Sequence, residues 1–264
     1  MKNSTTLRSK PFQIPAIAAV LLMATAPEQA TAQLSIAAVN TPYTITFDAS
    51  TAGVVNGAYD GSGFSPTPAA GQLNSNAWAT TGMSNGNLAF GGTNTTSDHA
   101  RGTSSAAGGV TTGGFYAFNA ANIGSRAFGI KANSLNWVPG TVTLRVQNTS
   151  GFTLNSIDIA YALWVNNSQS ASSQFVFSWS ANNSTYTKVG ALDHTSPTFS
   201  DAAGYVVNNK SATISGMNVP DNAYLYLRWS GFDATISLGG RDAFALDNIS
   251  ITGHAPAPVL SVGA

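Results

Sequence analysis

The sequence contains no cysteine, a single glutamate (Glu28) and few charged residues of either sign. The missing cysteines exclude a disulfide framework and thiol chemistry, so the fold must rest on its hydrophobic core and on any bound metal. Charged residues make up only 8% of the chain. Its solubility must therefore come from asparagine, serine, threonine and backbone groups. No hydrophobic run is long and unbroken enough to span a membrane.

The N-terminal segment has the pattern of a secretory signal peptide. Lys2, Arg8 and Lys10 precede an apolar run over residues 14–26, and small residues follow at 30–32. We predict a leader over residues 1–32, with cleavage before Gln33. Residues 33–264 then carry 8 basic and 10 acidic residues, the acidic ones all aspartate. This chain has no basic field that could hold phosphates, so we expect an extracellular protein, free or held at a cell surface, that does not bind nucleic acid.

The remaining sequence predicts one all-β domain over residues 33–253 and a short flexible tail over 254–264. Apolar residues alternate along about a dozen short segments, which turns rich in Gly, Asn and Ser separate. Neither an amphipathic helix nor a repeat of fixed period is visible. A first strand is expected at 43–48 after an extended lead-in, and long loops at 49–114. This pattern favours a two-sheet antiparallel β-sandwich of jelly-roll type.

Two hairpins are predicted within this domain. The clearer one joins a strand at 141–147 to a strand at 154–165, and the other joins 174–180 to 185–189. In the second hairpin Phe175, Phe177 and Trp179 recur with a period of two. We expect this aromatic row to be buried.

Five segments of the chain carry a family resemblance: 140–148, 154–161, 177–180 with 185–187, 224–230 and 241–251. They resemble a jelly-roll module of secreted bacterial proteins, similar to carbohydrate-binding modules, that often accompanies an enzyme or a secretion-sorting domain. Neither of these companions is recognisable in this sequence. The resemblance covers residues 42–252, and it implies the fold more firmly than a function.

The last predicted strand contains a break in its alternating pattern at Asp247 and Asn248. Asp48 ends the first predicted strand, which is expected to pair with the last. Carbohydrate-binding sandwiches commonly hold a structural Ca²⁺ between these strands, and Ca²⁺ takes six to eight oxygen ligands. One hypothesis is a calcium ion bound by Asp48, Asp247, Asn248 and neighbouring carbonyls. The alternative is that these side chains hydrogen-bond a bulged backbone.

A recognition site for sugar hydroxyls is a second hypothesis, in the loop before the last strand. Here Trp229 supplies an aromatic face, Arg241 a planar fork of donors, and Asp233 and Asp242 acceptors. The alternative is that Arg241 forms a structural ion pair with Asp242 or Asp233 while Trp229 lies in the core.

The other tryptophans divide by their surroundings. Trp164 and Trp179 lie in regular strands and are expected to be buried. Trp78 and Trp137 border turns, so they could form an exposed platform for a ligand or could anchor loops.

Catalysis has little support in the sequence. His99 follows Asp98 and His194 follows Asp193, but no Gly-x-Ser-x-Gly or His-Glu-x-x-His motif is present. Without glutamate after residue 32, only an aspartate pair could perform glycosidase chemistry. We therefore favour surface histidines over catalytic ones, and the sequence leaves open whether the protein is an enzyme.

The leading interpretation is a secreted, non-catalytic module that binds glycans or another extracellular polymer. An extracellular structural or adhesive protein that self-associates through sheet edges is the alternative, and a hydrolase is the third.

Overall fold

The computed structural model describes Met1 and residues 33–201, 204–234 and 240–257. Apart from Met1, the predicted leader lies outside these ranges, as do residues 258–264 of the predicted tail. Within the described ranges, no helix has the length and apolar character needed to cross a membrane.

Two seven-stranded sheets dominate the described part of the chain. The first, called the β9 sheet, contains in spatial order β1 (Leu34–Ile36), β9 (Gly140–Asn148), β15 (Tyr224–Asp233), β11 (Ser173–Ser180) and β12 (Thr187–Lys188), with β5 (Trp78–Thr81) beside β9 and β13 (His194–Thr195) beside β11. The second, called the β16 sheet, contains β14 (Tyr205–Val219), β10 (Leu154–Asn166), β16 (Ala243–His254), β8 (Ala127–Lys131), β7 (Gly114–Phe118) and β6 (Thr103–Ser104), with β2 (Pro42–Ile45) beside β16.

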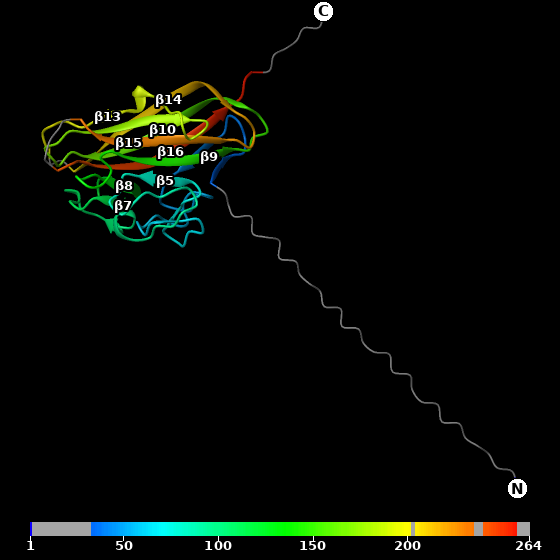
Figure 1. The fold of residues 1–264 in the computed structure, drawn as a ribbon, viewed down its shortest axis with the longest axis horizontal. Helices are drawn as coiled ribbons and strands as arrows, with labels where there is room; N and C mark the ends of the chain where they lie inside the picture. The colour runs from blue at the N-terminus through cyan, green and yellow to red at the C-terminus, as the bar shows by residue number, and fades with distance from the viewer. Residues whose placement is uncertain (2–32, 202–203, 235–239, 258–264) are drawn as a thin grey trace, which may run out of the picture.

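The remaining elements are short. They are the strands β3 (Phe64–Ser65) and β4 (Leu73–Asn74), which pair with each other, and the 3₁₀ helices η1 (Ser97–His99) and η2 (Gly190–Leu192). Figure 1 shows the long strands running in similar directions along the domain, with β5, β7, β8 and neighbouring loops gathered along one side. The predicted all-β sandwich is confirmed. Its long strands pair antiparallel, while three short pairs, β1 with β9, β3 with β4 and β6 with β7, are parallel.

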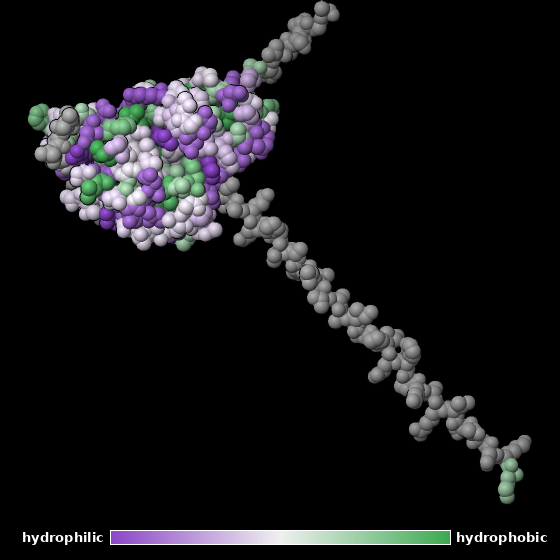
Figure 2. All heavy atoms as spheres, in the orientation of Figure 1, coloured by the Kyte–Doolittle hydropathy of each residue, from purple (hydrophilic) through white to green (hydrophobic). Residues whose placement is uncertain are grey.

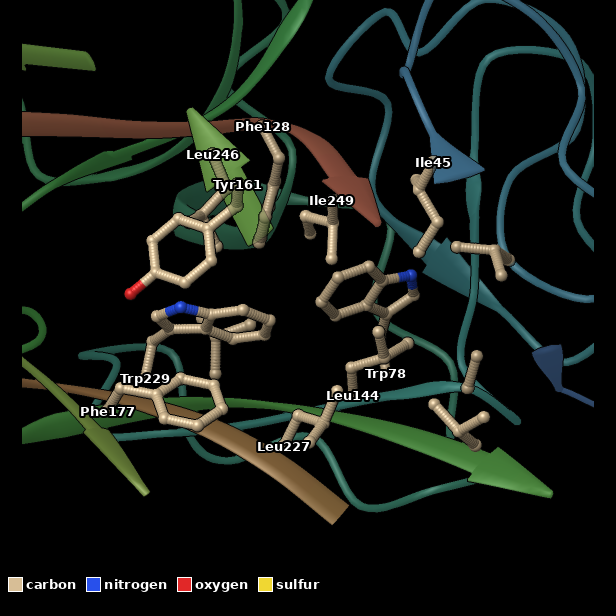
Figure 3. Packing of buried hydrophobic residues seen from close by; sticks show 14 of the residues in the cluster. Ile45, Trp78, Phe128, Leu144, Tyr161, Phe177, Leu227, Trp229, Leu246 and Ile249 are labelled. Carbon is tan, nitrogen blue, oxygen red and sulfur yellow. The ribbon is translucent and has the colours of Figure 1, made fainter. Parts of the chain in front are cut away.

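The core lies between the two sheets, because alternate residues of each strand point inward. Tyr161 and Leu246 enter it from the β16 sheet, and Phe177 and Trp229 from the β9 sheet (Figure 3). The rings of Tyr161 and Trp229 meet edge to face at 5.7 Å. Each large side chain buried in this way contributes about 1.5–3 kcal/mol. The outside is different in character, and on the face seen in Figure 2 the apolar residues form separate patches among polar ones.

The clearer predicted hairpin is wrong. β9 and β10 have nearly the predicted bounds, but they belong to opposite sheets. The turn between them is organised by Asn148, whose Nδ2 donates to the carbonyl of Phe152 at 2.7 Å and to that of Val219 at 2.9 Å. Val219 ends β14 of the β16 sheet. Asn148 therefore ties the end of β9 to the opposite sheet, and the chain crosses over instead of folding back.

The second predicted hairpin is confirmed, although β11 and β12 pair over only two residues each. Phe175 and Phe177 are fully buried, as predicted, and Trp179 packs against the core while remaining partly exposed. Hairpin pairing here follows local sequence, because the short turn at 181–186 returns the chain to the same sheet.

The two ends of the domain meet. The predicted first strand is shorter than expected and forms β2, and the predicted lead-in contains β1, which pairs with β9. The predicted pairing of first and last strands is confirmed, since Ile45 lies opposite Ile249 and Pro42 opposite Thr252. β16 continues to His254, one residue past the predicted domain boundary.

Candidate functional site

The predicted metal ligands lie together beside the junction of β2 and β16. β16 contains a bulge, because Asn248 and Ile249 occupy the space opposite the single residue Tyr161. Asn248 has a φ of 50°. Asp247 is buried, and its carboxylate accepts bonds from the Asn248 amide at 2.7 Å and from Ser125 Oγ at 2.9 Å. These are the hydrogen bonds expected from the alternative hypothesis, in which the side chains bond a bulged backbone.

Asp48 lies near enough to Asp247 to affect its titration. Burial, against the hydrogen bonds from Ser125 and Asn248 and with a small added repulsion from Asp48, raises the pKa of Asp247 to about 6. Asp48 Oδ1 accepts a bond from the Arg126 amide at 2.7 Å. The described residues contain no group of three or more His, Cys, Asp or Glu side chains that could hold a metal. Calcium would therefore depend on two carboxylates and neutral oxygens, and its binding stays a prediction.

Substitution of Asp247 by asparagine tests both hypotheses. In chelator, Asp247→Asn should raise the unfolding free energy at pH 7.5 by about 1 kcal/mol, and the gain should disappear near pH 4. The sign follows from the raised pKa of Asp247. The stability contributed by its protonated carboxyl is fully present below about pH 3.9 and is lost as the pH rises through about 6. Asparagine cannot ionise, so the variant does not lose this stability at about pH 7.5.

Calcium is tested by thermal melting of the same pair of proteins. If calcium binds, excess Ca²⁺ should raise the melting temperature of the wild type and leave that of Asp247→Asn unchanged. Equal melting of the wild type in chelator and in calcium would reject the metal. Asp158→Asn, at an exposed carboxylate, is the control.

The predicted sugar site before β16 is instead an ion pair beside a buried carboxylate. Arg241 donates from Nε to Asp233 Oδ1 at 2.7 Å and from Nη2 to Asp233 Oδ2. Asp242 is fully buried and accepts bonds from the Gln169 amide at 3.1 Å and from Ser196 Oγ. Trp229 is also fully buried. The ion pair and the buried tryptophan are those of the structural alternative, and sugar binding here stays a prediction.

Trp78 and Trp137 do not form an exposed platform. They are 0% and 1% exposed, so the exposed-platform alternative is wrong. Trp78 lies in strand β5, and Trp137 lies in the turn before β9, where the loop-anchor alternative places it. Trp137 lies over two glycines that face each other across β9 and β15, Gly140 and Gly231. A Cβ atom at Gly231 would lie 2.1 Å from Cε3 of Trp137. The absence of two side chains thus creates the slot that takes the indole.

His99 is buried, so the expectation of a surface histidine is wrong at this position. Its Nδ1 lies 3.0 Å from Asp98 Oδ1 and its Nε2 lies 2.9 Å from Thr80 Oγ1. Burial lowers the pKa of His99 against the attraction of Asp98. The order hydroxyl, imidazole, carboxylate is that of a catalytic triad. The network is buried, however, because Thr80, His99 and Asp98 are each at most 1% exposed.

Asp98 completes this network. Its Oδ2 accepts bonds from Ser84 Oγ at 2.8 Å and from the Asn85 amide at 2.7 Å. Burial acts to raise the pKa of Asp98, but the hydrogen bonds from Asn85 and Ser84 and the nearby His99 outweigh it, and the pKa lies below its ordinary value. We interpret the network as a structural support for the loop that joins β5 to η1.

The outer surface of the β9 sheet presents a different set of residues. Leu225, Leu227 and Trp229 of β15 point into the core, so the residues between them point outward. Together with neighbours from β9 and two loops, these outward residues form what we call the arginine face: Phe90, Arg145, Tyr186, Tyr224, Tyr226 and Arg228. All six are partly exposed.

The two arginines of this face are stacked on aromatic rings. The guanidinium carbon of Arg145 lies 4.6 Å from the ring centre of Phe90 and 4.8 Å from that of Tyr224. That of Arg228 lies 3.5 Å from the ring centre of Tyr186. Burial lowers the pKa of Arg228, and it raises the pKa of Tyr186 against the attraction of the guanidinium. Such contacts hold long, otherwise mobile side chains in place.

Tyr226 lies at the centre of the arginine face. It is opposite Arg145 across the β9–β15 pair, and its ring lies 5.9 Å from Phe90 and 6.3 Å from Tyr224. A hollow of about 310 Å³ adjoins this cluster. It is lined in part by Phe90, Arg228, Asn183 and the threonines Thr141 and Thr143. The surface therefore combines aromatic rings, hydroxyls, an amide and guanidinium donors.

Sequence reasoning missed the arginine face, although part of its signal was present. The alternation of Tyr224, Tyr226 and Arg228 with Leu225 and Leu227 places three polar-tipped side chains on one side of a strand. The loop residues Phe90 and Tyr186 carry no comparable signal, because their position beside β9 and β15 depends on the whole fold.

Comparison with known proteins gives structural neighbours only. No protein-family model and no curated sequence matches the chain. The K2 cleaved adhesin domain of Lys-gingipain matches with 14% identity and a TM-score of 0.37, covering 80% of this chain and 98% of the adhesin. The CBM22-1 xylan-binding domain from Paenibacillus barcinonensis Xyn10C matches with 12% identity and a TM-score of 0.32, covering 55% and 83% of the two chains.

A third match is the TmCBM61 module in complex with β-1,4-galactotriose, with 10% identity, a TM-score of 0.29, and 50% and 72% of the two chains covered. These three neighbours are carbohydrate-binding and adhesin domains. Their low scores assign no ligand to this chain, so its function must be argued from its own surface.

Proposed function

We propose that the protein is an extracellular, non-catalytic module that binds a polysaccharide on the arginine face. The observation that supports this most is the partly exposed row of Tyr224, Tyr226 and Arg228 beside a hollow lined with hydroxyl and amide groups. The ring of Tyr226 can pack on the apolar face of a sugar, while hydroxyls, amides and guanidinium groups bond the sugar hydroxyls. A long sheet surface suits a chain of sugars better than a small solute.

A glycosidase is less consistent with this surface. Retaining and inverting enzymes place two carboxyl groups about 5–9.5 Å apart around the bond that they cleave. None of the described residues that line the hollow or form the arginine face is an aspartate or a glutamate.

An adhesive protein that self-associates is a second candidate, and one observation favours it. β14 is 15 residues long and, in the described part of the chain, pairs only with β10, so its other edge is open. Open edges can add a strand from another molecule. Lys210 lies within β14 and its ammonium group donates to the Asp193 carbonyl at 2.6 Å, a charge of the kind that opposes such pairing.

The proposed function is tested by retention of the protein on a panel of immobilised neutral and acidic polysaccharides. Substitution of the central ring in Tyr226→Ala should weaken binding at least tenfold, about 1.4 kcal/mol, because it removes the surface between the two arginines. Phe152→Ala is the control, since Phe152 is an exposed ring at the β9–β10 turn. Retention on no member of the panel, or equal retention of Tyr226→Ala and wild type, would reject the proposal.

A further inference from the structure

We propose that the ligand of the arginine face is an acidic polysaccharide, and that Arg145 and Arg228 bind the carboxylates of its uronic acid residues. This inference rests on the proposed function and names its ligand class. It follows from three features of the face: its charge, the state of its aromatic rings and the spacing of its arginines.

The charge of the face is uncompensated. Within the described residues, neither Arg145 nor Arg228 forms a salt bridge, whereas Lys188 pairs with Asp193 and Arg241 with Asp233. The neighbouring polar side chains on β9 and in the β11–β12 turn, such as Thr143 and Asn183, are neutral. Since residues 33–264 carry two more acidic than basic groups, two unpaired cations on one surface are a local exception. Partly desolvated cations attract an anion more strongly than fully hydrated ones.

The aromatic rings are already engaged by the guanidinium groups. Tyr186 has Arg228 over its ring, and Arg145 contacts the rings of both Phe90 and Tyr224. Those ring surfaces are not free for a neutral sugar to stack on. Stacking instead fixes the plane of each guanidinium and leaves N–H groups at its edge. The face is thus better organised for planar anions than for sugar rings alone.

Each guanidinium is oriented but not saturated by hydrogen bonds. Arg145 donates from Nε and Nη2 to the Asn76 carbonyl at 3.0 and 2.6 Å, and from Nη2 to Gln33 Oε1 at 3.4 Å. Arg228 donates from Nε to Thr143 Oγ1 at 3.0 Å and from Nη2 to Asn183 Oδ1 at 3.5 Å. The Nη1 group of each arginine takes part in none of these bonds. A guanidinium has five N–H donors, so each arginine keeps donors for a carboxylate.

The spacing of the arginines suits a polymer that repeats its charge. Arg145 lies opposite Tyr226, and Arg228 follows Tyr226 by two residues on the same strand. The two arginines are therefore diagonal neighbours, about 7–8 Å apart at the backbone. Their side chains diverge toward different aromatic partners, with Tyr226 between them. A chain with several carboxylates can engage both sites at once, which raises the effective concentration for the second contact.

The test uses three soluble polyuronates, namely polygalacturonate, alginate and hyaluronate, each beside its carboxyl-reduced form. We expect at least one polyuronate to bind the wild type at least tenfold more tightly than its carboxyl-reduced partner in affinity electrophoresis. Arg145→Gln and Arg228→Gln should each remove most of that difference. Lys188→Gln, which removes a cation that is 62% exposed and already paired with Asp193, should leave it unchanged.

The outcomes separate this inference from the proposed function. Two results would overturn the acidic ligand and keep the polysaccharide module, provided that Tyr226→Ala loses binding. One is equal binding of native and carboxyl-reduced polysaccharides, and the other is binding of neutral polysaccharides alone. Binding of no polysaccharide would overturn both. Dextran sulfate and single-stranded DNA serve as polyanion controls, and binding of these as tight as that of the polyuronate would also overturn carboxylate recognition. Correct folding of every variant is checked by its melting temperature.

Discussion

Replacing Asp98 with alanine should lower the unfolding free energy by about 3–5 kcal/mol, because the loss of a buried carboxylate leaves its partners unpaired. Three donors lose their acceptor, namely Ser84 Oγ, the Asn85 amide and the His99 ring. For a domain of this size the melting temperature should fall by roughly 6–20 °C. Thermal and urea unfolding of the purified variant measure the effect.

The control for Asp98→Ala is Asp158→Ala. Asp158 is exposed and bonds Thr213 at 2.6 Å and His254 at 2.8 Å, so its loss should cost no more than about 1 kcal/mol. The lowered pKa of Asp98 adds a pH signature. Its ionised form stabilises the fold above pH 3.9, so the deficit of the variant should persist at pH 5 and shrink only below about pH 3.9. Equal stability of the two variants would contradict the structural role of the network.

Substitution of Gly231 by alanine should destabilise the domain by about 3 kcal/mol, because the added methyl group would overlap the indole of Trp137. The new Cβ atom would lie 2.1 Å from Cε3 and 2.6 Å from the carbonyl oxygen of Trp137. The indole has little room to move, since it also contacts Phe175 with ring centres 5.4 Å apart. Unfolding monitored by tryptophan fluorescence reports both the stability and the displacement of the ring.

Gly190→Ala provides the matched control. No atom lies within 4 Å of a Cβ placed at Gly190, and the residue belongs to the short helix η2. That variant should unfold within about 0.5 kcal/mol of the wild type. A Gly231→Ala protein as stable as Gly190→Ala would show that the slot for Trp137 is wider than the structure indicates.

The sandwich itself could be predicted from the sequence, because alternation of apolar residues is a local property. This alternation correctly located most long strands and the inward-facing side chains of Phe175 and Phe177. Pairing is not local. The segments that became β9 and β10 satisfy the pattern of a hairpin, and only the bonds of Asn148 to Val219, 71 residues away, show that the chain crosses to the other sheet.

The candidate sites were less predictable, for the same reason. Trp137 borders a proline and a glycine, which is typical of an exposed turn, but its slot needs Gly231 from a strand far along the chain. His99 lies in a polar segment, yet Thr80 and Asp98 bury it within a network. The ion pair of Arg241 with Asp233 was foreseen as an alternative, because both residues flank one loop.

The pairing of the two ends has a consequence for how the protein is made. Residues 42–45 form β2, and their partners at 249–252 are among the last that the ribosome adds to the domain. β1 likewise cannot pair until β9, more than 100 residues later in the chain, has been synthesised. Contacts between such distant segments form slowly, because a long loop must close before they stabilise anything. The nascent chain therefore cannot complete the sandwich until translation has passed β16, because β2 has its partner strand only then.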